Sequence, residues 1–489
     1  MVNETRVLLI NPPLYRLHGQ MQASPPLGLL YIARYLNEKG INTKVYNADY
    51  EAGFIFRESD IDKRHQHLKN LYNPNFEAWK AVRQIIRKHS PDIVGITTTT
   101  SSYISALNVA KIVKEEMPHT KIILGGSHVT ALPQEAASQP EIDAVVIGEG
   151  EQTMLEIAQG RKYKDIKGLC FKHRKRIIKT QCRELIKDID TLPFPMLEDM
   201  IFEKTRKRTF SEMFSSRGCP YNCIFCASAL IWKRRLRLRR PEKIYEEMLF
   251  RKERYNAEEF QFGDDALTLN KERILTVCKY IKRLDVTWKC QTRADHVSKD
   301  IVKVMKDSGC REIALGIESG NQRVLDIARK NIKVEDIKRA ARIIKEEGIQ
   351  LMAFFIFGLP GETEQSIQDT FNLIRDIRPD GIVANIATPL PGTELYNMAE
   401  NGEWITNRDW ANYYIVGRAD SVMQLPTIER KKVVEAYLKL QKMADNTRAK
   451  IIRRTFLNPS FILKKVSIND LRNPQELWRK MKIFYNVVK

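Results

Sequence analysis

The stretch Arg217-Gly-Cys-Pro-Tyr-Asn-Cys-Ile-Phe-Cys226 places three cysteines at C-x3-C-x2-C spacing, directly after a short predicted strand. Three thiolates at this spacing are typical of a [4Fe–4S] cluster, and they leave one of its irons without a protein ligand. A structural zinc site is the alternative, but closed tetrahedral coordination needs a fourth cysteine or histidine. Neither residue type occurs between Cys226 and Cys278. The spacing therefore favours a cluster held by Cys219, Cys223 and Cys226.

The bulk composition is that of a globular chain too long for a single core. Of its 489 residues, 43% are hydrophobic and 29% are charged, which predicts two or three domains. Eight cysteines do not make a disulfide scaffold in a chain of this length, so their clustering indicates metal binding. No apolar run approaches the roughly 18 residues that a membrane span needs, and the polar amino end shows no signal peptide. We therefore expect a cytoplasmic protein.

The formal net charge of +21 is large. It favours anionic partners, such as nucleic acid, an anionic membrane surface, phosphate-bearing cofactors or an acidic protein. Thermophilic surface chemistry explains such an excess equally well, because Lys, Arg and Glu rise together there. No specific nucleic-acid-binding module is recognisable in the sequence.

Short apolar strands alternate with helical patterns through the first 150 residues. This rhythm is typical of an α/β domain with a doubly wound, five-stranded parallel sheet. In such sheets, ligands bind outside the carboxyl ends of the strands. The expected strands are residues 7–10, 44–46, 93–96, 122–124 and 144–147, and helices are expected at 27–39 and 102–116.

A second α/β repeat follows a small hairpin over residues 165–185 and a proline-bearing linker at 190–195. Six strand-and-helix units predict a partial (β/α)6 barrel of the TIM type, with its chemistry at the carboxyl ends of the strands. The strands are expected to end at Cys219, Asp265, Asp295, Ser319, Pro360 and Pro391, and helices are expected at 242–254, 271–283, 334–347 and 364–375. We expect domains at 1–160 and 201–395, a hairpin and linker at 161–200, and a helical, basic carboxyl-terminal region at 396–489.

The cysteine motif resembles the signature of the radical S-adenosylmethionine (SAM) superfamily, including the aromatic Phe225 before the last cysteine. The resemblance implies that the open iron chelates SAM and that polar residues at later strand ends contact it. Gly263-Asp-Asp265 stands where the family contacts the SAM amino group, although the usual Gly-Gly-Glu is replaced. The implied SAM contacts are Phe225, Asp264, Asp265, Arg293, Glu318, Ser319 and Gly358.

A five-stranded doubly wound domain in front of such a barrel is similar to the cobalamin-binding class of this superfamily. The resemblance rests on Asn11-Pro-Pro13, on Pro25-Pro-Leu-Gly28 and on the paired Gly125 and Gly126, which follow Thr98 at the family's separation. The alternative is a vestigial sheet that binds nothing. The implied cobalamin contacts are Asn11, Pro12, Thr98, Thr99, Ser101, Gly125, Gly126, Ser127, His128, Gly148, Glu149 and Gly150.

The sequence departs from many cobalamin domains in one respect, because the Asp-x-His-x-x-Gly loop that supplies a histidine to cobalt is missing. The corresponding stretch offers only His18, which follows Arg16 rather than an aspartate. We therefore expect His18 to be a loop histidine and cobalamin to bind with no histidine beneath the metal.

The resemblance implies an enzyme that uses a [4Fe–4S] cluster, SAM and cobalamin to methylate an unactivated carbon, with a reductant such as ferredoxin or flavodoxin. Two alternatives stay open. One is a radical cyclisation, rearrangement or carbon–carbon coupling on a lipid or tetrapyrrole, and the other is a non-catalytic cobalamin or SAM sensor. A methylthiolating enzyme is disfavoured because that class needs amino-terminal cysteines, and the first cysteine here is Cys170. The sequence identifies neither the substrate nor a general acid or base.

Two basic segments are left with open interpretations. Residues 233–240 could meet the SAM carboxylate or an acidic substrate, or could form a solvated face. Residues 446–489 carry eleven Lys and Arg residues against Asp470 and Glu476, a net charge of +9. A helix expected from Asn473 places Trp478, Phe484 and Tyr485 on an apolar stripe. That stripe could pack on the barrel or lie on an anionic membrane and deliver a hydrophobic substrate, and the basic surface could instead recruit an acidic protein substrate.

Overall fold

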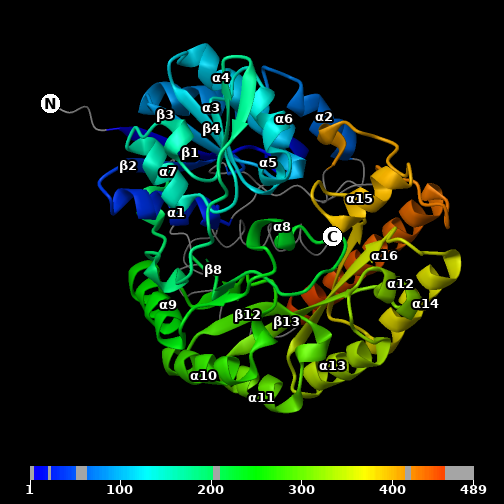
Figure 1. The fold of residues 1–489 in the computed structure, drawn as a ribbon. Helices are drawn as coiled ribbons and strands as arrows, with labels where there is room; N and C mark the ends of the chain where they lie inside the picture. Colours follow the sequence, from blue (N-terminus) through cyan, green and yellow to red (C-terminus); the bar gives the residue numbers. More distant parts are fainter. Residues whose placement is uncertain (1–4, 20–23, 51–62, 202–209, 414–419, 457–489) are drawn as a thin grey trace, which may run out of the picture.

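The computed structural model describes residues 5–19, 24–50, 63–201, 210–413 and 420–456. Figure 1 shows two α/β units, with the amino-terminal sheet in blue and cyan above a larger, curved sheet in green to orange. This architecture confirms the expected fold class, a doubly wound sheet followed by a partial barrel.

The amino-terminal sheet has seven strands in the order β2-β1-β3-β4-β5-β6-β7. The five expected strands are parallel to one another. The expected hairpin forms as well, and it continues the sheet, because β6 pairs antiparallel with β5. The strands are β1 Arg6–Asn11, β2 Asn42–Asn47, β3 Ile93–Thr97, β4 Lys121–Gly125, β5 Ala144–Val146, β6 Leu169–His173 and β7 Arg176–Lys179.

Both faces of this sheet are covered, because successive side chains of a strand point to opposite faces. In β1, Leu8 and Ile10 pack in one apolar cluster, and Val7 and Leu9 pack in another. The first cluster contains side chains of α3 Glu77–His89, α4 Tyr103–Glu116, α5 Ser127–Ala131 and α6 Pro133–Ser138. The second contains side chains of α1 Leu27–Asn37 and α7 Glu151–Ala158. The remaining helix of this unit is α2 Lys63–Leu71.

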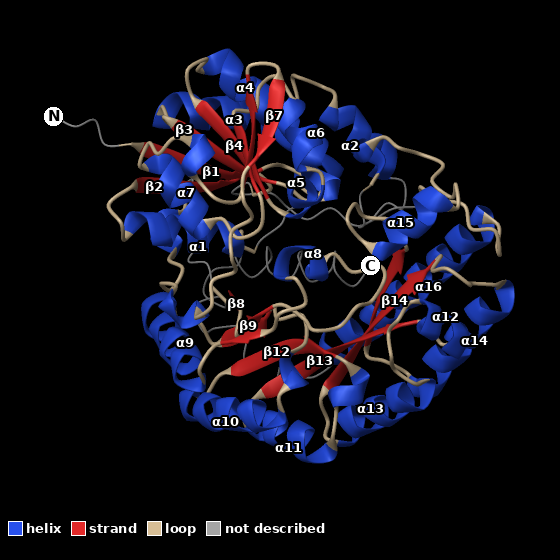
Figure 2. Ribbon diagram, viewed as in Figure 1, coloured by secondary structure: helices blue, strands red, loops and turns tan. Residues whose placement is uncertain are grey.

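The barrel is an open sheet of six parallel strands in the order β15-β14-β13-β12-β11-β8, and its helices lie on the convex side (Figure 2). The strands are β8 Glu212–Met213, β11 Glu259–Phe262, β12 Thr287–Thr292, β13 Cys310–Glu318, β14 Gln350–Phe357 and β15 Gly381–Ile386. The outer helices are α9 Pro241–Tyr255, α10 Lys271–Ile281, α11 Lys299–Asp307, α12 Gln322–Ile327, α13 Val334–Glu346 and α14 Glu364–Ile377. Six strand-and-helix units were expected, but no ranges were given from the sequence for α11 and α12.

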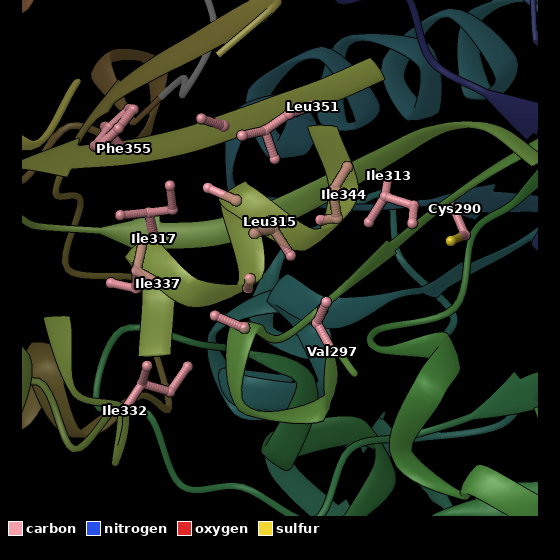
Figure 3. Packing of buried hydrophobic residues seen from close by; sticks show 14 of the residues in the cluster. Cys290, Val297, Ile313, Leu315, Ile317, Ile332, Ile337, Ile344, Leu351 and Phe355 are labelled. Carbon is pink, nitrogen blue, oxygen red and sulfur yellow. The ribbon is translucent and has the colours of Figure 1, made fainter. Parts of the chain in front are cut away.

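The barrel core lies between the sheet and these helices. Figure 3 shows Ile313, Leu315 and Ile317 of β13 beside Ile337 and Ile344 of α13. These three residues alternate along β13 with residues of the opposite face, as expected for a strand that turns one face toward the helices.

The segment after the cluster motif folds between the two sheets. It contains the short helix α8 Ser228–Trp232 (Figure 1). The strand β9 Ser216–Arg217, which leads into the motif, pairs antiparallel with β10 Arg237–Leu238.

The carboxyl-terminal region is helical where the structure describes it. Helix α15 Glu394–Asn401 is followed by a 3₁₀ turn, Trp410–Asn412, and by α16 Arg430–Phe456, which packs along β15. The predicted helix from Asn473 and its apolar stripe lie outside the described residues. Among the helices that the structure describes, none is both long enough and apolar enough to cross a membrane.

Candidate active site between the two sheets

The carboxyl ends of both parallel sheets open into one cavity of about 670 Å³. Its walls come from the strand ends and turns of the amino-terminal sheet and from the start of the barrel. The barrel contributes Phe214, Ser216, Arg217, Gly218, Ile231, Trp232, Gly263 and Asp265. The volume is in the range of ordinary ligand sites, and the site lies where parallel sheets bind their ligands.

Nine of the twelve expected cobalamin contacts line this cavity. They are Asn11, Pro12, Thr99, Ser101, Gly125, Gly126, Gly148, Glu149 and Gly150. The other three, Thr98, Ser127 and His128, are not among the lining residues. Thr98 is fully buried, and its hydroxyl donates to the carbonyl of Gly125 at 2.8 Å, so it holds the turn from behind.

His128 is turned into the core of the amino-terminal domain. Its Nδ1 atom lies 3.2 Å from Oγ1 of Thr100, and its ring packs against those of Tyr103 and Trp410. Burial lowers the pKa of His128 to about 4, so the imidazole is neutral at physiological pH.

The glycine-lined wall fits a bulky ligand. A β-carbon at Gly126 would lie 2.2 Å from the carbonyl oxygen of Thr98, so only glycine allows this turn its close approach. At Gly28 and Gly148 a β-carbon would meet no protein atom within 4 Å. The wall is therefore open toward the cavity at these positions, and the residues present fit the expected cobalamin.

The stretch that lacks the cobalt-ligating motif is held by Asp49, which follows β2. Its carboxylate accepts hydrogen bonds from the backbone N–H groups of Leu14 and Arg16, at 2.5 and 3.1 Å. Burial raises the pKa of Asp49 to about 6. His18 lines the cavity, and its ring stacks on the buried ring of His67 with 4.4 Å between centroids. The sequence predicted only a loop histidine and did not indicate its place on the cavity wall.

The three motif cysteines lie on a loop that is anchored to the barrel. Ile224, between the second and third cysteine, is buried and donates its N–H to the carbonyl of Ala328 at 3.1 Å. Burial, the carboxylate of Asp265 and the other two thiols raise the pKa of Cys226 to about 11. The cysteines thus lie close enough to interact electrostatically, and a bound cluster would displace their protons.

In the described part of the chain, no three His, Cys, Asp or Glu side chains converge on one point, as a mononuclear metal requires. Thiolates that each bind a different iron of one cluster do not need that convergence. The donor set of three cysteines at C-x3-C-x2-C spacing fits a [4Fe–4S] cluster.

The two aspartates after β11 have different surroundings. Asp264 is 1% exposed and accepts hydrogen bonds from the backbone N–H and hydroxyl of Ser215 and from the hydroxyl of Ser216, at 2.7, 2.5 and 2.6 Å. It ties the strand before the motif to β11. Asp265 lines the cavity and accepts from the hydroxyl of Ser228 at 2.5 Å. Of these two aspartates, Asp265 is the one that lines the cavity.

Arg293 supports the cluster loop from below. Its guanidinium pairs with Asp295 at 3.0 Å, donates to the carbonyl of Lys330 at 2.7 Å and lies 3.5 Å from the ring centroid of Tyr221. The hydroxyl of Tyr221, a residue of the cluster loop, lies 2.5 Å from Nε2 of His296. Neither Tyr221 nor His296 was predicted from the sequence as a site residue.

The end of β13 carries Glu318 in a left-handed conformation (φ 68°), at an irregularity in the pairing with β14. Its carboxylate pairs with the ammonium of Lys330, which was not predicted from the sequence either. The same ammonium lies 6.0 Å from the ring centroid of Phe225. Ser319 is fully buried, and its hydroxyl accepts the N–H of Asn321 at 3.2 Å.

Gly358 occupies the turn after β14 with a φ of 83°. Its N–H donates to the carboxylate of Glu362, which is fully buried. Burial raises the pKa of Glu362 to about 8, against the lowering effect of two backbone hydrogen bonds.

The basic segment 233–240 divides between surface and interior. Lys233, Arg234 and Arg235 are exposed, as the solvated alternative predicted. Arg237 instead pairs with Glu149 at 2.8 Å, and Arg239 pairs with Glu247. These two arginines are buried in ion pairs within the protein, an outcome that neither alternative foresaw.

Comparisons with known proteins agree with this geometry. The model of the radical SAM superfamily matches residues 213–374, and that of the B12 binding domain matches residues 22–158. An uncharacterised methyltransferase of Pyrococcus horikoshii is 32% identical and covers 95% of this chain and 94% of its own. The anaerobic magnesium-protoporphyrin IX monomethyl ester cyclase of Rubrivivax gelatinosus is 29% identical over 94% of this chain and 78% of its own.

Among solved structures, the cobalamin-dependent SAM radical enzyme OxsB, with aqua-cobalamin and SAM bound, aligns with a TM-score of 0.69. The alignment covers 99% of this chain and 72% of that one at 15% identity. At this identity the likeness concerns the fold alone.

Proposed function

The chain belongs to the family of cobalamin-dependent radical SAM enzymes, and on that basis we propose that it methylates an unactivated carbon of a substrate that enters the cavity between the two sheets. The observation that carries the proposal is the shared cavity itself. Gly126 and Gly148 of the amino-terminal domain and Gly218 and Asp265 of the barrel line the same space. A substrate there can reach both cofactor beds without moving between sites.

The residues have separate tasks in this scheme. Cys219, Cys223 and Cys226 hold the cluster, and Asp265 and the other expected SAM contacts orient SAM against it. The nine cavity-lining contacts of the amino-terminal domain hold cobalamin. When bound, these groups supply a reactive radical and a transferable methyl group.

The protein contributes orientation and exclusion of water. Lys330 and Glu318 form an ion pair at the end of β13, near the ring of Phe225. Arg293 and Tyr221 keep the cluster loop in one conformation. The wall formed by Leu9, Leu27 and Ile123 keeps the cobalamin side of the cavity apolar, and close positioning of reactants in such a site lowers the barrier to reaction.

We propose that each segment of the chain has its own role. Residues 1–160 bind cobalamin and 201–395 bind the cluster and SAM, with 161–200 as connection. Within the region 396–489, the described helix α16 covers the open edge of the barrel, and its packing along β15 supports this role.

The experiment that tests the function is anaerobic reconstitution with iron, sulfide, hydroxocobalamin, SAM and a reductant, followed by incubation with extract fractions. Mass spectrometry should detect a compound that gains one methyl group together with formation of 5′-deoxyadenosine or S-adenosylhomocysteine. SAM cleavage with no methylated compound in any fraction would contradict the methyltransferase assignment.

A radical ring closure is the second candidate, favoured by the relative that is named a cyclase. A product of a tetrapyrrole monomethyl ester that contains a new ring and has gained no methyl group would identify it. Ferredoxin or flavodoxin is the proposed electron donor, because the large positive charge complements an acidic carrier. Association of the basic segment 446–489 with an anionic membrane remains a further proposal.

A further inference from the structure

A buried ion-pair cluster joins the strand before the cysteine motif to the amino-terminal sheet. Arg217, which directly precedes Gly218 and Cys219, donates from Nη1 to Oε1 of Glu149 and from Nη2 to Oε1 of Glu151, each at 2.7 Å. The side chains are 10%, 4% and 4% exposed, respectively. One guanidinium thus connects the cluster loop to the turn between β5 and α7.

The guanidinium is fixed by its neighbours on several sides. It lies 5.2 Å from the ring centroid of Tyr31 of α1 and 5.7 Å from that of Trp232 of α8. Arg237 shares the carboxylate of Glu149 and packs over the same indole at 5.2 Å. A planar fork that binds two carboxylates fixes their relative orientation, which the point charge of a lysine does not.

The ion-pair cluster lies between the binding sites proposed for the two cofactors. Four of the side chains named above line the cavity: Arg217, Glu149, Glu151 and Trp232. Toward the barrel, Arg217 is two residues from Cys219. Toward the sheet, Glu149 lies between Gly148 and Gly150, two of the expected cobalamin contacts. Any displacement of this ion pair therefore moves one cofactor bed against the other.

We propose that Arg217 is a positioning residue that fixes the separation between cobalt and the iron–sulfur cluster. The inference rests on the proposed function, because it requires both cofactors in one molecule. Misplacement by about 1 Å is enough to cost a reaction of this kind roughly two orders of magnitude in rate. Two carboxylates and two aromatic rings surround the guanidinium of Arg217 and restrict its movement.

A second contact between the domains makes the proposal testable without separating them. The indole N–H of Trp410 donates to Glu135 at 2.7 Å, and the hydroxyl of Ser101 donates to the carbonyl of Tyr413 at 3.0 Å. The carboxyl-terminal region therefore still holds the amino-terminal domain when Arg217 is changed.

The test compares R217K and E151Q with wild type and with the control R251K. Arg251 is fully buried and pairs with Glu247. Both residues lie on α9, an outer helix of the barrel, so R251K weakens a buried ion pair that lies within a single helix. Each protein is loaded with cluster and cobalamin, and pulsed electron paramagnetic resonance measures the distances between Co(II) and the reduced cluster.

We expect one narrow distance distribution in wild type and R251K, and a shifted or at least about two-fold broader one in R217K and E151Q, with metal contents unchanged. Unchanged distributions in both variants, or equal broadening in R251K, would overturn the proposal. Loss of the cluster in R217K with an unchanged distribution in E151Q would also overturn it, since Arg217 would then only support the loop. Absence of bound cobalamin from wild type would instead refute the proposed function, and the positioning role with it.

Discussion

The Nζ atom of Lys330 lies 2.7 Å from Oε1 of Glu318, and both side chains are only 8% exposed. The pair is located at the carboxyl end of β13, beneath the loop that carries the motif cysteines. Buried charges of this kind are stable only while each has its partner, because the lone ion would be desolvated without compensation.

Lys330→Met should therefore destabilise the protein by about 3–5 kcal/mol, since it leaves the Glu318 carboxylate buried without a partner. The double variant K330M/E318Q should recover part of that loss. Urea unfolding of the cluster-free protein measures both. The exposed pair Lys338–Asp376 is the control, and K338M should cost no more than about 1 kcal/mol. Equal losses in K330M and K338M would contradict the assignment of the buried pair.

The cysteine triad should hold the only cluster that reconstitution assembles. Changing Cys219, Cys223 and Cys226 together to Ala should remove essentially all iron, because the remaining cysteines give no second motif. Cys182 is exposed, and C182A is the matched control that should keep its iron. Iron and sulfide are measured after anaerobic reconstitution. A triple variant that retained near-wild-type iron and sulfide would contradict the assignment of these cysteines as the cluster ligands.

Cobalamin should bind with no histidine beneath cobalt, because the Asp-x-His-x-x-Gly loop is missing. Electron paramagnetic resonance of the Co(II) form should show no superhyperfine splitting from an axial nitrogen. The position of His18 on the cavity wall sharpens this test. Splitting that disappears in H18A would show that His18 is the ligand and that the expectation is wrong.

Glu362 makes stability depend on pH. Its pKa is raised from 4.5 to about 8 in the folded protein, so the folded state binds more protons than the unfolded state between these values. The stabilisation is fully present below about pH 4.5 and is lost as pH rises through about 8. At about 1.4 kcal/mol per pKa unit, the effect amounts to several kcal/mol.

Unfolding midpoints in urea between pH 5 and 9 check this dependence. The difference in stability between wild type and E362Q should shift in favour of the variant as pH rises. The exposed neighbour Glu364 provides the control E364Q, which should follow wild type. A constant difference between wild type and E362Q across the range would contradict the raised pKa.

The carboxyl-terminal segment should bind anionic vesicles in a salt-sensitive way. Basic residues near such a surface contribute about 1 kcal/mol each, and the predicted stripe with Trp478, Phe484 and Tyr485 adds apolar burial. Co-sedimentation should weaken with salt and with truncation at Asn473. If the truncated protein is insoluble, or the full chain ignores vesicles at low salt, the helix packs on the barrel instead.

Local sequence patterns predicted the fold well because the apolar pattern of a strand or a helix is visible within a few consecutive residues. The alternation Val7 to Ile10 and the spacing of the motif cysteines are such patterns. What could not be predicted is which way a residue faces once the chain has folded. His128 and Thr98 follow the expected order along the chain, yet both are turned away from the cavity.

Long-range pairs were the other gap. Arg217 and Arg237 lie in or near the motif, but their partner Glu149 is 68 and 88 residues away in sequence, so no local pattern predicts these ion pairs. Lys330 was missed for the same reason, since nothing beside it in sequence marks the glutamate that it meets.

The contact between Trp410 and Glu135 spans 275 residues of sequence. Ala411, next to this tryptophan, packs in the same apolar cluster as β1, α3 and α4, so this turn belongs by its contacts to the first domain although the chain reaches it after the barrel. The segment that must be exchanged between relatives to keep this contact is therefore discontinuous in sequence. A chimera that exchanges residues 1–160 alone would pair a foreign α4–α6 surface with the resident indole, whereas one that also carries the turn Trp410–Asn412 would inherit a matched joint.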